Sequence, residues 1–380
     1  MKHAPLLAAL LLALAPAASA EAACPEGVSW PTTTWPKTQH YGPATDALGD
    51  FAFTLVGTDE ERKGVRTDGV LVVHHGRIVY ERYARGFGAD NPHLAWSVSK
   101  SMIDALLGMA VVRGWLTLDD SVCDHYDHVD ECSITIADLH AMGSGLDWNE
   151  GYENDPYYLS SVIAMLYGVG ALDMAAFVGS HGLEHTPGTV FRYSSGDTVL
   201  LSAVIAGALP DDLHSSFPRQ WLFEPLGMSS AIFEQDRAGT FVGSSYAYAT
   251  PRDMARFGYL YLHDGCWEGE RLLPEGWVER STGVNPVFVQ DALVWDEQTD
   301  NVPGRQWWTN HPVPELGYDA LWPDVPEDTF QASGHWGQTI TVIPSLDLVV
   351  VRTADDRETG VLDENRFLRL AIELAQEADR

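Results

Sequence analysis

The hydrophobic pattern of the chain predicts strands near both of its ends. Residues 69–83 place two apolar runs around His75-Gly76, and residues 338–352 place two around Pro344-Ser345. Short apolar runs rich in Val and Ile that are joined by a turn pair are typical of β-hairpins. We therefore predict one hairpin close to the start of the chain and a second close to its end.

The segment that begins at Ser97 has the spacing of a helix instead. Apolar residues recur every three to four positions until Gly114, and residues 363–378 repeat this pattern with a polar opposite face. Such spacing places the apolar side chains on one side of a helix, and a glycine commonly ends it. The first helix carries Met102, Ile103, Leu106, Leu107 and Ala110, and the last carries Phe367, Ala371 and Leu374.

Strands at the two ends and helices between them predict an α/β chain of the α+β type. The expected sheet draws on residues 21–95 and 236–380, and residues 96–235 form a helical region inserted between these two parts. Layers of this kind bury the apolar face of each element against the other. We expect a central antiparallel sheet flanked by helices, with a catalytic cleft between the sheet and the helical region.

Residues 1–20 have the features of a secretory signal peptide. Met1-Lys2-His3 precedes an apolar run that ends in Ala18-Ser19-Ala20, and this order of charge, apolar run and small residues marks a cleaved signal. The run is short for a membrane anchor, because a helix that crosses a bilayer needs about 20 apolar residues. We predict cleavage near Ala20, no stable membrane anchor, and a periplasmic or secreted protein.

The four cysteines fit an exported protein, since disulfides form and persist in oxidising compartments. Cys123 and Cys132 bracket a short acidic segment, which leaves Cys24 and Cys266 as the other pair. The bracketed segment also contains two histidines that could bind a metal ion, but a solvated loop closed by a disulfide is the simpler interpretation.

Acidic residues dominate the predicted mature chain. It has 22 basic and 54 acidic residues, a balance of −32 with histidine neutral. A field of this sign repels nucleic acid and anionic membranes and slows the approach of anionic substrates. We therefore expect no nucleic-acid partner, and solubility or salt tolerance explains the charge most simply. No feature of the sequence indicates the oligomeric state.

Ser97 and Lys100 lie three residues apart at the start of a predicted helix, so their side chains share one face. Lysine is scarce, because Lys100 and two others are the only lysines after the expected cleavage site. An apolar setting lowers the pKa of a lysine, which can then act as a base, whereas arginine stays charged. The free N–H of Ser97 at the helix start would face a developing oxyanion. Ser99 faces elsewhere and is interpreted as a helix-start residue.

Further motifs follow this pair in a fixed order. They are residues 96–102, 114–120, 134–139, 142–148, 187–189, 191–197 and 334–338. Together they resemble the serine β-lactamase and penicillin-binding protein superfamily over residues 65–355, and most closely its class C-like branch. That branch also holds carboxylesterases, D-aminopeptidases and 6-aminohexanoate-dimer hydrolases. The resemblance implies a β-lactamase/transpeptidase-like fold with Ser97 as nucleophile and Lys100 as base.

By the same resemblance, Tyr193 is the tyrosine that relays a proton between the nucleophile and the leaving group. A phenol near a lysine ammonium can have its pKa lowered from about 10 and can then act as an acid or a base. Two residues later the branch usually has asparagine, where this chain has Ser195 with a shorter side chain and no amide donor. Tyr152 resembles a substrate-side tyrosine of the 6-aminohexanoate-dimer hydrolases.

Where β-lactamases carry Lys-Thr-Gly on the strand that lines the site, this chain has His335-Trp336-Gly337. The lysine of that motif supplies a fixed charge for the substrate carboxylate, whereas histidine is mostly neutral near physiological pH. Trp336 also replaces a small hydroxyl donor with a large apolar surface. We expect Gly337 to let the strand approach the acyl group, and the N–H of Gln338 to complete the oxyanion hole with that of Ser97.

These features predict an exported serine hydrolase that cleaves neutral ester or amide bonds of small molecules through an acyl-enzyme, without a metal or other cofactor. The alternatives are a β-lactamase or a D-amino-acid peptidase and, in another class, a non-catalytic sensor of peptidoglycan or another ligand. The chain has no G-x-S-x-G, H-E-x-x-H or H-x-H-x-D-H run, which disfavours an α/β-hydrolase, a zincin and a metallo-β-lactamase. The histidines without a companion motif are interpreted as surface or core residues: His74, His75, His181 and His185.

Overall fold

A six-stranded antiparallel sheet is the central element of the computed structural model, which describes residues 23–58, 60–152, 156, 159–294 and 301–380. The predicted signal peptide lies outside the described residues. The strand order is β2-β1-β11-β10-β9-β8. In that order the strands are Arg77–Tyr83, Thr67–His74, Leu348–Ala354, Gln338–Ile343, Phe330–Gly334 and Trp308–Thr309.

Both predicted hairpins are present, as β1 with β2 and as β10 with β11. Every residue of β1 and of β11 is buried, because helices cover both faces of the sheet at these strands. A strand that is buried on both faces reads as a continuous apolar run instead of an alternating one. This explains the Val-rich runs in both hairpins.

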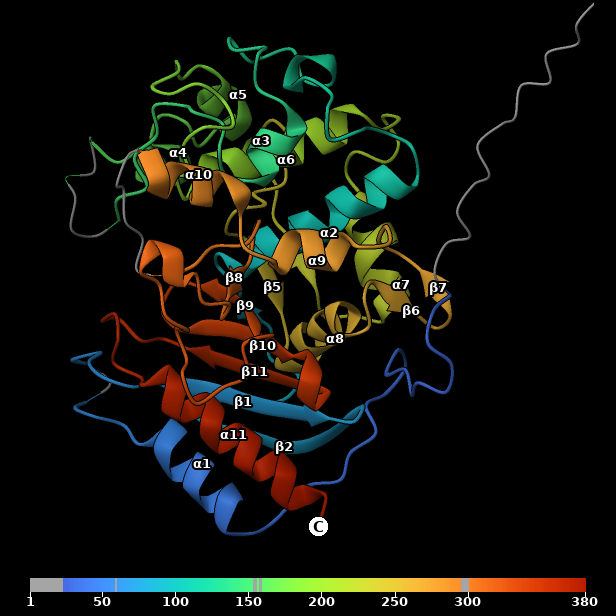
Figure 1. Ribbon diagram of the computed structural model, residues 1–380, viewed down its shortest axis with the longest axis vertical. Coiled ribbons are helices and arrows are strands. Elements are labelled where there is room, and N and C mark those ends of the chain that lie inside the picture. Colours follow the sequence, from blue (N-terminus) through green and yellow to red (C-terminus); the bar gives the residue numbers. More distant parts are fainter. Residues whose placement is uncertain (1–22, 59, 153–155, 157–158, 295–300) are drawn as a thin grey trace, which may run out of the picture.

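The two faces of the sheet are covered by helices from distant parts of the chain (Figure 1). On one face, α1 (Pro43–Phe53) and α11 (Glu364–Ala378) lie side by side and pack on β1. On the other face, α8 (Pro251–Leu262) packs on β1, β10 and β11, and α2 (Val98–Val112) packs on β9. The sequence pattern did not predict α1, which begins with a proline, a residue that is well suited to the first turn of a helix.

Beyond α2 lies a helical region with α6 (Ser195–Gly207) at its centre, where it contacts α2, α3, α4 and α5. Phe288 of the later helix α10 packs in one cluster with Met142 and Phe191 of this region. The remaining helices are α3 (Ile136–His140), α4 (Ser161–Tyr167), α5 (Met174–Gly179), α7 (Glu224–Leu226), α9 (Trp277–Thr282) and α10 (Pro286–Val294). The division of the chain near residues 95 and 236 stays a prediction.

Two small sheets complete the regular structure. One has the order β3-β5-β4 and the other pairs β6 with β7. Their strands are β3 (His93–Leu94), β4 (Ile232–Phe233), β5 (Ala247–Ala249), β6 (Cys266–Trp267) and β7 (Glu270–Arg271). The arrangement confirms the predicted α+β architecture, with a central antiparallel sheet flanked by helices and an additional helical region.

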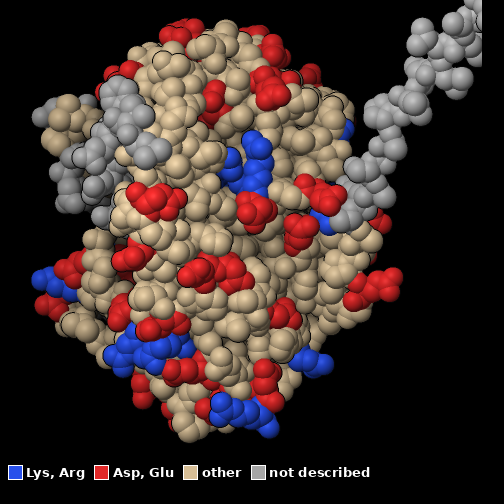
Figure 2. All heavy atoms as spheres, viewed as in Figure 1, with Lys and Arg blue, Asp and Glu red and all other residues tan. Residues whose placement is uncertain are grey.

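Acidic side chains are spread over the face of the molecule shown in Figure 2, whereas basic side chains gather in a few places. This distribution agrees with a net charge of −31 for the whole chain. Among the described residues, no helix combines the length and the apolar character that a membrane crossing requires.

Two disulfides join the four cysteines. Cys123 bonds to Cys132 across nine positions, and Cys24 bonds to Cys266 across 242 positions. The short bridge closes one loop, whereas the long bridge ties the start of the described chain to β6.

The two disulfides are expected to contribute unequally to stability. In the chain-entropy model a longer closed loop restricts the unfolded chain more, which gives about 3 kcal/mol for Cys123–Cys132 and about 5 kcal/mol for Cys24–Cys266. Urea unfolding of the two paired Cys→Ala variants measures these losses in the free energy of unfolding. A larger loss for the short bridge would contradict the entropic account.

Candidate active site

Ser97 lies at the N-cap of α2, immediately after a residue with an unusual backbone conformation. Trp96 has a φ of 49°, in the left-handed region that bulky residues rarely adopt, and such residues cluster at functional sites. This turn directs the chain from β3 into the helix. Among the residues that the structure describes, the Ser97 N–H has no hydrogen-bond acceptor, as expected for a donor at a helix start.

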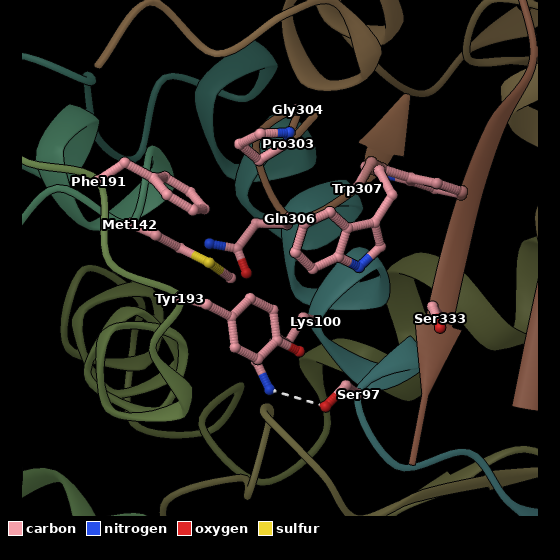
Figure 3. A pocket seen from close by; sticks show the side chains of 11 residues that line it. Ser97, Lys100, Met142, Phe191, Tyr193, Pro303, Gly304, Gln306, Trp307 and Ser333 are labelled. Carbon is pink, nitrogen blue, oxygen red and sulfur yellow. Dashed lines mark hydrogen bonds between the residues drawn. The ribbon is translucent and has the colours of Figure 1, made fainter. Parts of the chain in front are cut away.

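Lys100 points from the next turn of α2 back to Ser97, as Figure 3 shows. Its Nζ donates to Ser97 Oγ at 3.1 Å, to Ser195 Oγ at 2.9 Å and to the Ser244 carbonyl oxygen at 3.0 Å. Lys100 is only 1% exposed. Burial lowers the pKa of Lys100 to about 8, against an opposing contribution from the negative charge of Glu150. A neutral Lys100 is therefore accessible at mildly alkaline pH.

Tyr193 lies against both members of this pair. Its ring is 4.9 Å from Lys100 Nζ and stacks on Trp308 with ring centroids 5.5 Å apart. Burial, and after it the charge of Glu150, raises the pKa of Tyr193, while a side-chain hydrogen bond with Ser97 opposes this rise. The sequence predicts a lowered pKa, and that expectation is wrong because burial and the charge of Glu150 outweigh the hydrogen bond with Ser97. Tyr193 therefore keeps its proton.

Glu150 is the residue of this site that sequence reasoning missed. Its carboxylate accepts hydrogen bonds from the Ser195 N–H at 2.8 Å, the Ser195 hydroxyl, the Trp148 indole N–H and the Tyr152 hydroxyl, the last two at 2.6 Å. Ser195 accepts from Lys100 and donates to Glu150, so it bridges the ammonium group and the carboxylate. Glu150 lies two residues before Tyr152 in the sequence, but the sequence does not indicate which residues the Glu150 carboxylate contacts.

Aromatic rings form a wall next to Ser97. The His335 ring lies 5.2 Å from the Tyr152 ring and 5.7 Å from the Trp96 ring, measured between centroids. Trp336 packs 5.3 Å from Trp96 and carries the guanidinium group of Arg357 on its face. The wall brings together Tyr152, His335 and Trp336, three residues that the sequence associated with the substrate site.

The strand that lines the site differs from the expected one. Residues 335–337 are not in a strand but form the turn between β9 and β10. The glycine beside the nucleophile is Gly334, where a Cβ atom would lie 2.3 Å from the Ala95 carbonyl oxygen and 3.2 Å from the Ser97 nitrogen. Only glycine fits so close an approach. A Cβ atom at Gly337 would instead meet Arg352 and Asp356, so Gly334 and not Gly337 lies against the backbone of the nucleophile, and the role expected for Gly337 stays a prediction.

Gln338 is held within the central sheet, where it pairs with Gly334. It belongs to β10, which lies between β9 and β11, so its backbone groups face neighbouring strands. Its side-chain amide donates to the carbonyl oxygens of His335, Trp336 and Ala354, and its side-chain oxygen accepts from the Ala354 N–H. Gln338 therefore fastens the turn to β11. The role expected for its N–H in the oxyanion hole stays a prediction.

A narrow pocket opens at Ser97, Lys100 and Tyr193 (Figure 3). Among the side chains that line it, Lys100 is the only charged one. The other lining residues are Met142, Phe191, Pro303, Gly304, Gln306, Trp307, Trp308 and Ser333. Ser333 is the β9 residue that faces this pocket.

A model of the beta-lactamase family matches residues 53–374, which is most of the chain. The chain belongs to the beta-lactamase family. It is therefore a serine hydrolase related to β-lactamases, and its substrates are small molecules with an amide or ester bond. The predicted β-lactamase/transpeptidase-like fold is confirmed.

Proteins that are similar to this chain carry several names. This chain is 26% identical over 291 residues to the 6-aminohexanoate-dimer hydrolase of Paenarthrobacter ureafaciens, and the match covers 70% of this chain and 71% of that protein. A Bacillus anthracis structure, provisionally named 6-aminohexanoate-dimer hydrolase, aligns with a TM-score of 0.69 at 22% identity over 92% and 89% of the two chains. A family VIII carboxylesterase aligns with a TM-score of 0.62 at 14% identity over 88% and 98%. At these identities the two structures establish the fold alone.

Proposed function

We propose that this protein is an exported serine hydrolase that cleaves neutral ester or amide bonds through an acyl-enzyme on Ser97. The observation that carries the proposal is the contact of 3.1 Å between Lys100 Nζ and Ser97 Oγ, made by a lysine whose pKa burial lowers to about 8. A serine hydroxyl is a weak nucleophile until a neighbouring base takes its proton.

In the acylation step, neutral Lys100 accepts the proton of Ser97 while Oγ attacks the carbonyl carbon. The carbonyl π electrons move to its oxygen, which becomes the oxyanion of a tetrahedral intermediate. The Ser97 N–H is one donor to this oxyanion. As the second donor we propose the backbone N–H of His335 in place of that of Gln338, because His335 follows Gly334, the residue packed against the Ser97 nitrogen.

Collapse of the intermediate breaks the bond to the leaving group. Tyr193 keeps its proton because its pKa is raised, so it can donate this proton to the departing nitrogen or oxygen and regain one from Lys100. Water then attacks the acyl-enzyme with the same groups acting in reverse. The acid product leaves, and Ser97 recovers its proton.

Several features favour neutral substrates. Ala332 and Ser333 precede Gly334 on the strand that lines the site, so that strand carries no lysine for a substrate carboxylate. The wall of Trp96, Tyr152, His335 and Trp336 offers apolar surface next to the nucleophile. We therefore retain the expectation of a neutral substrate, but it now rests on the residues of β9 instead of on His335.

Export is supported by two features of different origin. The signal-like segment of residues 1–20 precedes the chain that the structure describes. The two disulfides suit an oxidising compartment. A periplasmic or secreted location is therefore part of the proposal.

We also propose that Glu150 is a positioning residue, because it holds Ser195 and lies close enough to the ammonium group to raise the pKa of Lys100. Glu150→Gln should lower kcat/KM on the order of 10- to 100-fold, since an amide cannot accept all four hydrogen bonds. The alkaline rise of activity should also move to lower pH. Asp147→Asn, an exposed change in the same segment, is the control; an unshifted pH profile for Glu150→Gln would oppose the role.

The proposed function is tested with a fluorophosphonate and a substrate panel. Intact-mass and peptide mass spectrometry should find one adduct, on Ser97. Among p-nitrophenyl esters, a 6-aminohexanoate dimer, nitrocefin and a D-alanyl anilide, the neutral esters should be hydrolysed fastest. Absence of an adduct would favour a non-catalytic sensor. Faster hydrolysis of nitrocefin or of the anilide would favour a β-lactamase or a D-amino-acid peptidase.

A further inference from the structure

Two histidines and two aspartates meet at the end of the sheet farthest from Gly334. His74 is the last residue of β1 and His75 begins the following turn, while Asp347 ends the turn before β11. The two turns are neighbours, because His74 pairs with Leu348 and the His75 N–H donates to the Asp347 carbonyl oxygen at 3.1 Å. Asp379 follows α11, which runs along the sheet and ends toward this end of it (Figure 1).

The backbone brings the two histidine rings together. Successive side chains of a strand point to opposite faces, but His75 has a φ of 48°, in the left-handed region. This turn breaks the alternation, and the two rings lie 3.9 Å apart between centroids. His74 is buried, whereas the His75 side chain is 58% exposed.

Asp379 reaches both rings with its two carboxylate oxygens. Its Oδ1 is 3.4 Å from His74 Nδ1, and its Oδ2 is 3.8 Å from His75 Nε2. One ligand atom from each of these three residues lies within 4.8 Å of the other two. Ligands of a tetrahedral zinc ion are about 2 Å from the metal. The exposed Asp379 side chain would have to rotate to bring the ligand atoms to such distances.

Asp347 supplies the support that metal-binding histidines usually have. Its Oδ2 lies 2.8 Å from His75 Nδ1, which fixes the proton on Nδ1 and leaves Nε2 as a ligand atom. Its Oδ1 is buried and has no hydrogen-bond partner among the described residues. His74 is held in turn by a hydrogen bond with the Leu346 backbone.

We propose that His74, His75 and Asp379 bind a divalent transition-metal ion, with zinc the best match, and that Asp347 orients His75 for this role. Imidazole nitrogen with carboxylate oxygen suits zinc and the neighbouring first-row metals better than magnesium. The strongly acidic protein favours cation binding. The ion would fasten the end of α11 to the end of β1 and to the turn that follows it. The site is independent of the proposed hydrolase and revises the interpretation of His74 and His75 as ordinary histidines.

The test is calorimetric titration of the untagged full chain, stripped with EDTA, with zinc chloride at neutral pH. One zinc ion should bind per chain and raise the Tm, and magnesium should not replace it. His75→Ala and Asp379→Asn should abolish binding, and Asp347→Asn should weaken it about 10- to 100-fold.

His128→Ala is the matched control, because His128 is an exposed histidine of the Cys123–Cys132 loop. This variant should bind zinc like the unaltered protein. His75 and Asp379 are both exposed enough for their variants to fold, which a melting curve without metal verifies. Failure to bind zinc, binding that survives His75→Ala or Asp379→Asn, or binding that is lost with His128→Ala overturns the proposal.

Discussion

Ser97→Ala is expected to abolish the fluorophosphonate adduct and to lower kcat by roughly 10⁵-fold, because the proposed acyl-enzyme forms on the Ser97 hydroxyl. The N–H groups beside the substrate carbonyl remain in this variant, so weak residual hydrolysis by water is compatible with the mechanism. Peptide mass spectrometry for the adduct and initial rates with a p-nitrophenyl ester measure both effects.

Ser99→Ala provides the matched control on the same turn of α2. The Ser99 hydroxyl accepts a hydrogen bond from the Ala247 N–H at 3.1 Å and is fully buried. Its loss should therefore reduce stability, by about 1 to 3 kcal/mol for an unsatisfied buried donor, while the adduct on Ser97 still forms. An adduct that persists in Ser97→Ala and disappears in Ser99→Ala would reverse the assignment of the nucleophile.

Lys100→Met is expected to lower the rate of acylation by roughly 10³-fold, within the range that a positioned general base supplies. Methionine has a similar length and fills the buried site, so the loss reports the missing base more than a cavity. Stopped-flow measurement of the acylation burst with a p-nitrophenyl ester separates this step from deacylation. Lys63→Met removes an exposed lysine and should leave the burst unchanged.

The pH dependence of kcat/KM tests the same assignment. Lys100 acts as a base only when it is neutral, and burial lowers its pKa to about 8. Activity of the unaltered protein should therefore be low below this pH and rise as the pH passes through it. Lys100→Met should lose this rise. If the rise of kcat/KM near pH 8 persists in Lys100→Met, the titrating group is a residue other than Lys100.

The catalytic pair could be proposed from sequence because its geometry is local. Residues three apart on a helix share a face whatever surrounds them, so Ser97 and Lys100 needed only a helix to meet. The apolar residues of α2 supplied both that helix and the burial that lowers the pKa of Lys100. Tyr193 is distant in sequence and could be assigned only through a resemblance.

The strand that lines the site shows where sequence reasoning failed. The resemblance predicts that His335-Trp336-Gly337 lies on a strand, whereas these residues form the turn after β9. Strand register is fixed by pairing with neighbours, and a small slip along the chain exchanges the residues that face a site. The short strand β9, with Ser333 and Gly334, lacked the long apolar run that revealed β1 and β11.

The sequence by itself determined the two hairpins, the α2 helix and the spacing of Ser97 and Lys100, because these depend on contacts within a few residues. Only the tertiary structure decided that Glu150, Ser195 and Gly334 meet this pair. It also decided that the pKa of Tyr193 rises. These outcomes depend on how distant segments pack and how much water they exclude, and no local pattern specifies either.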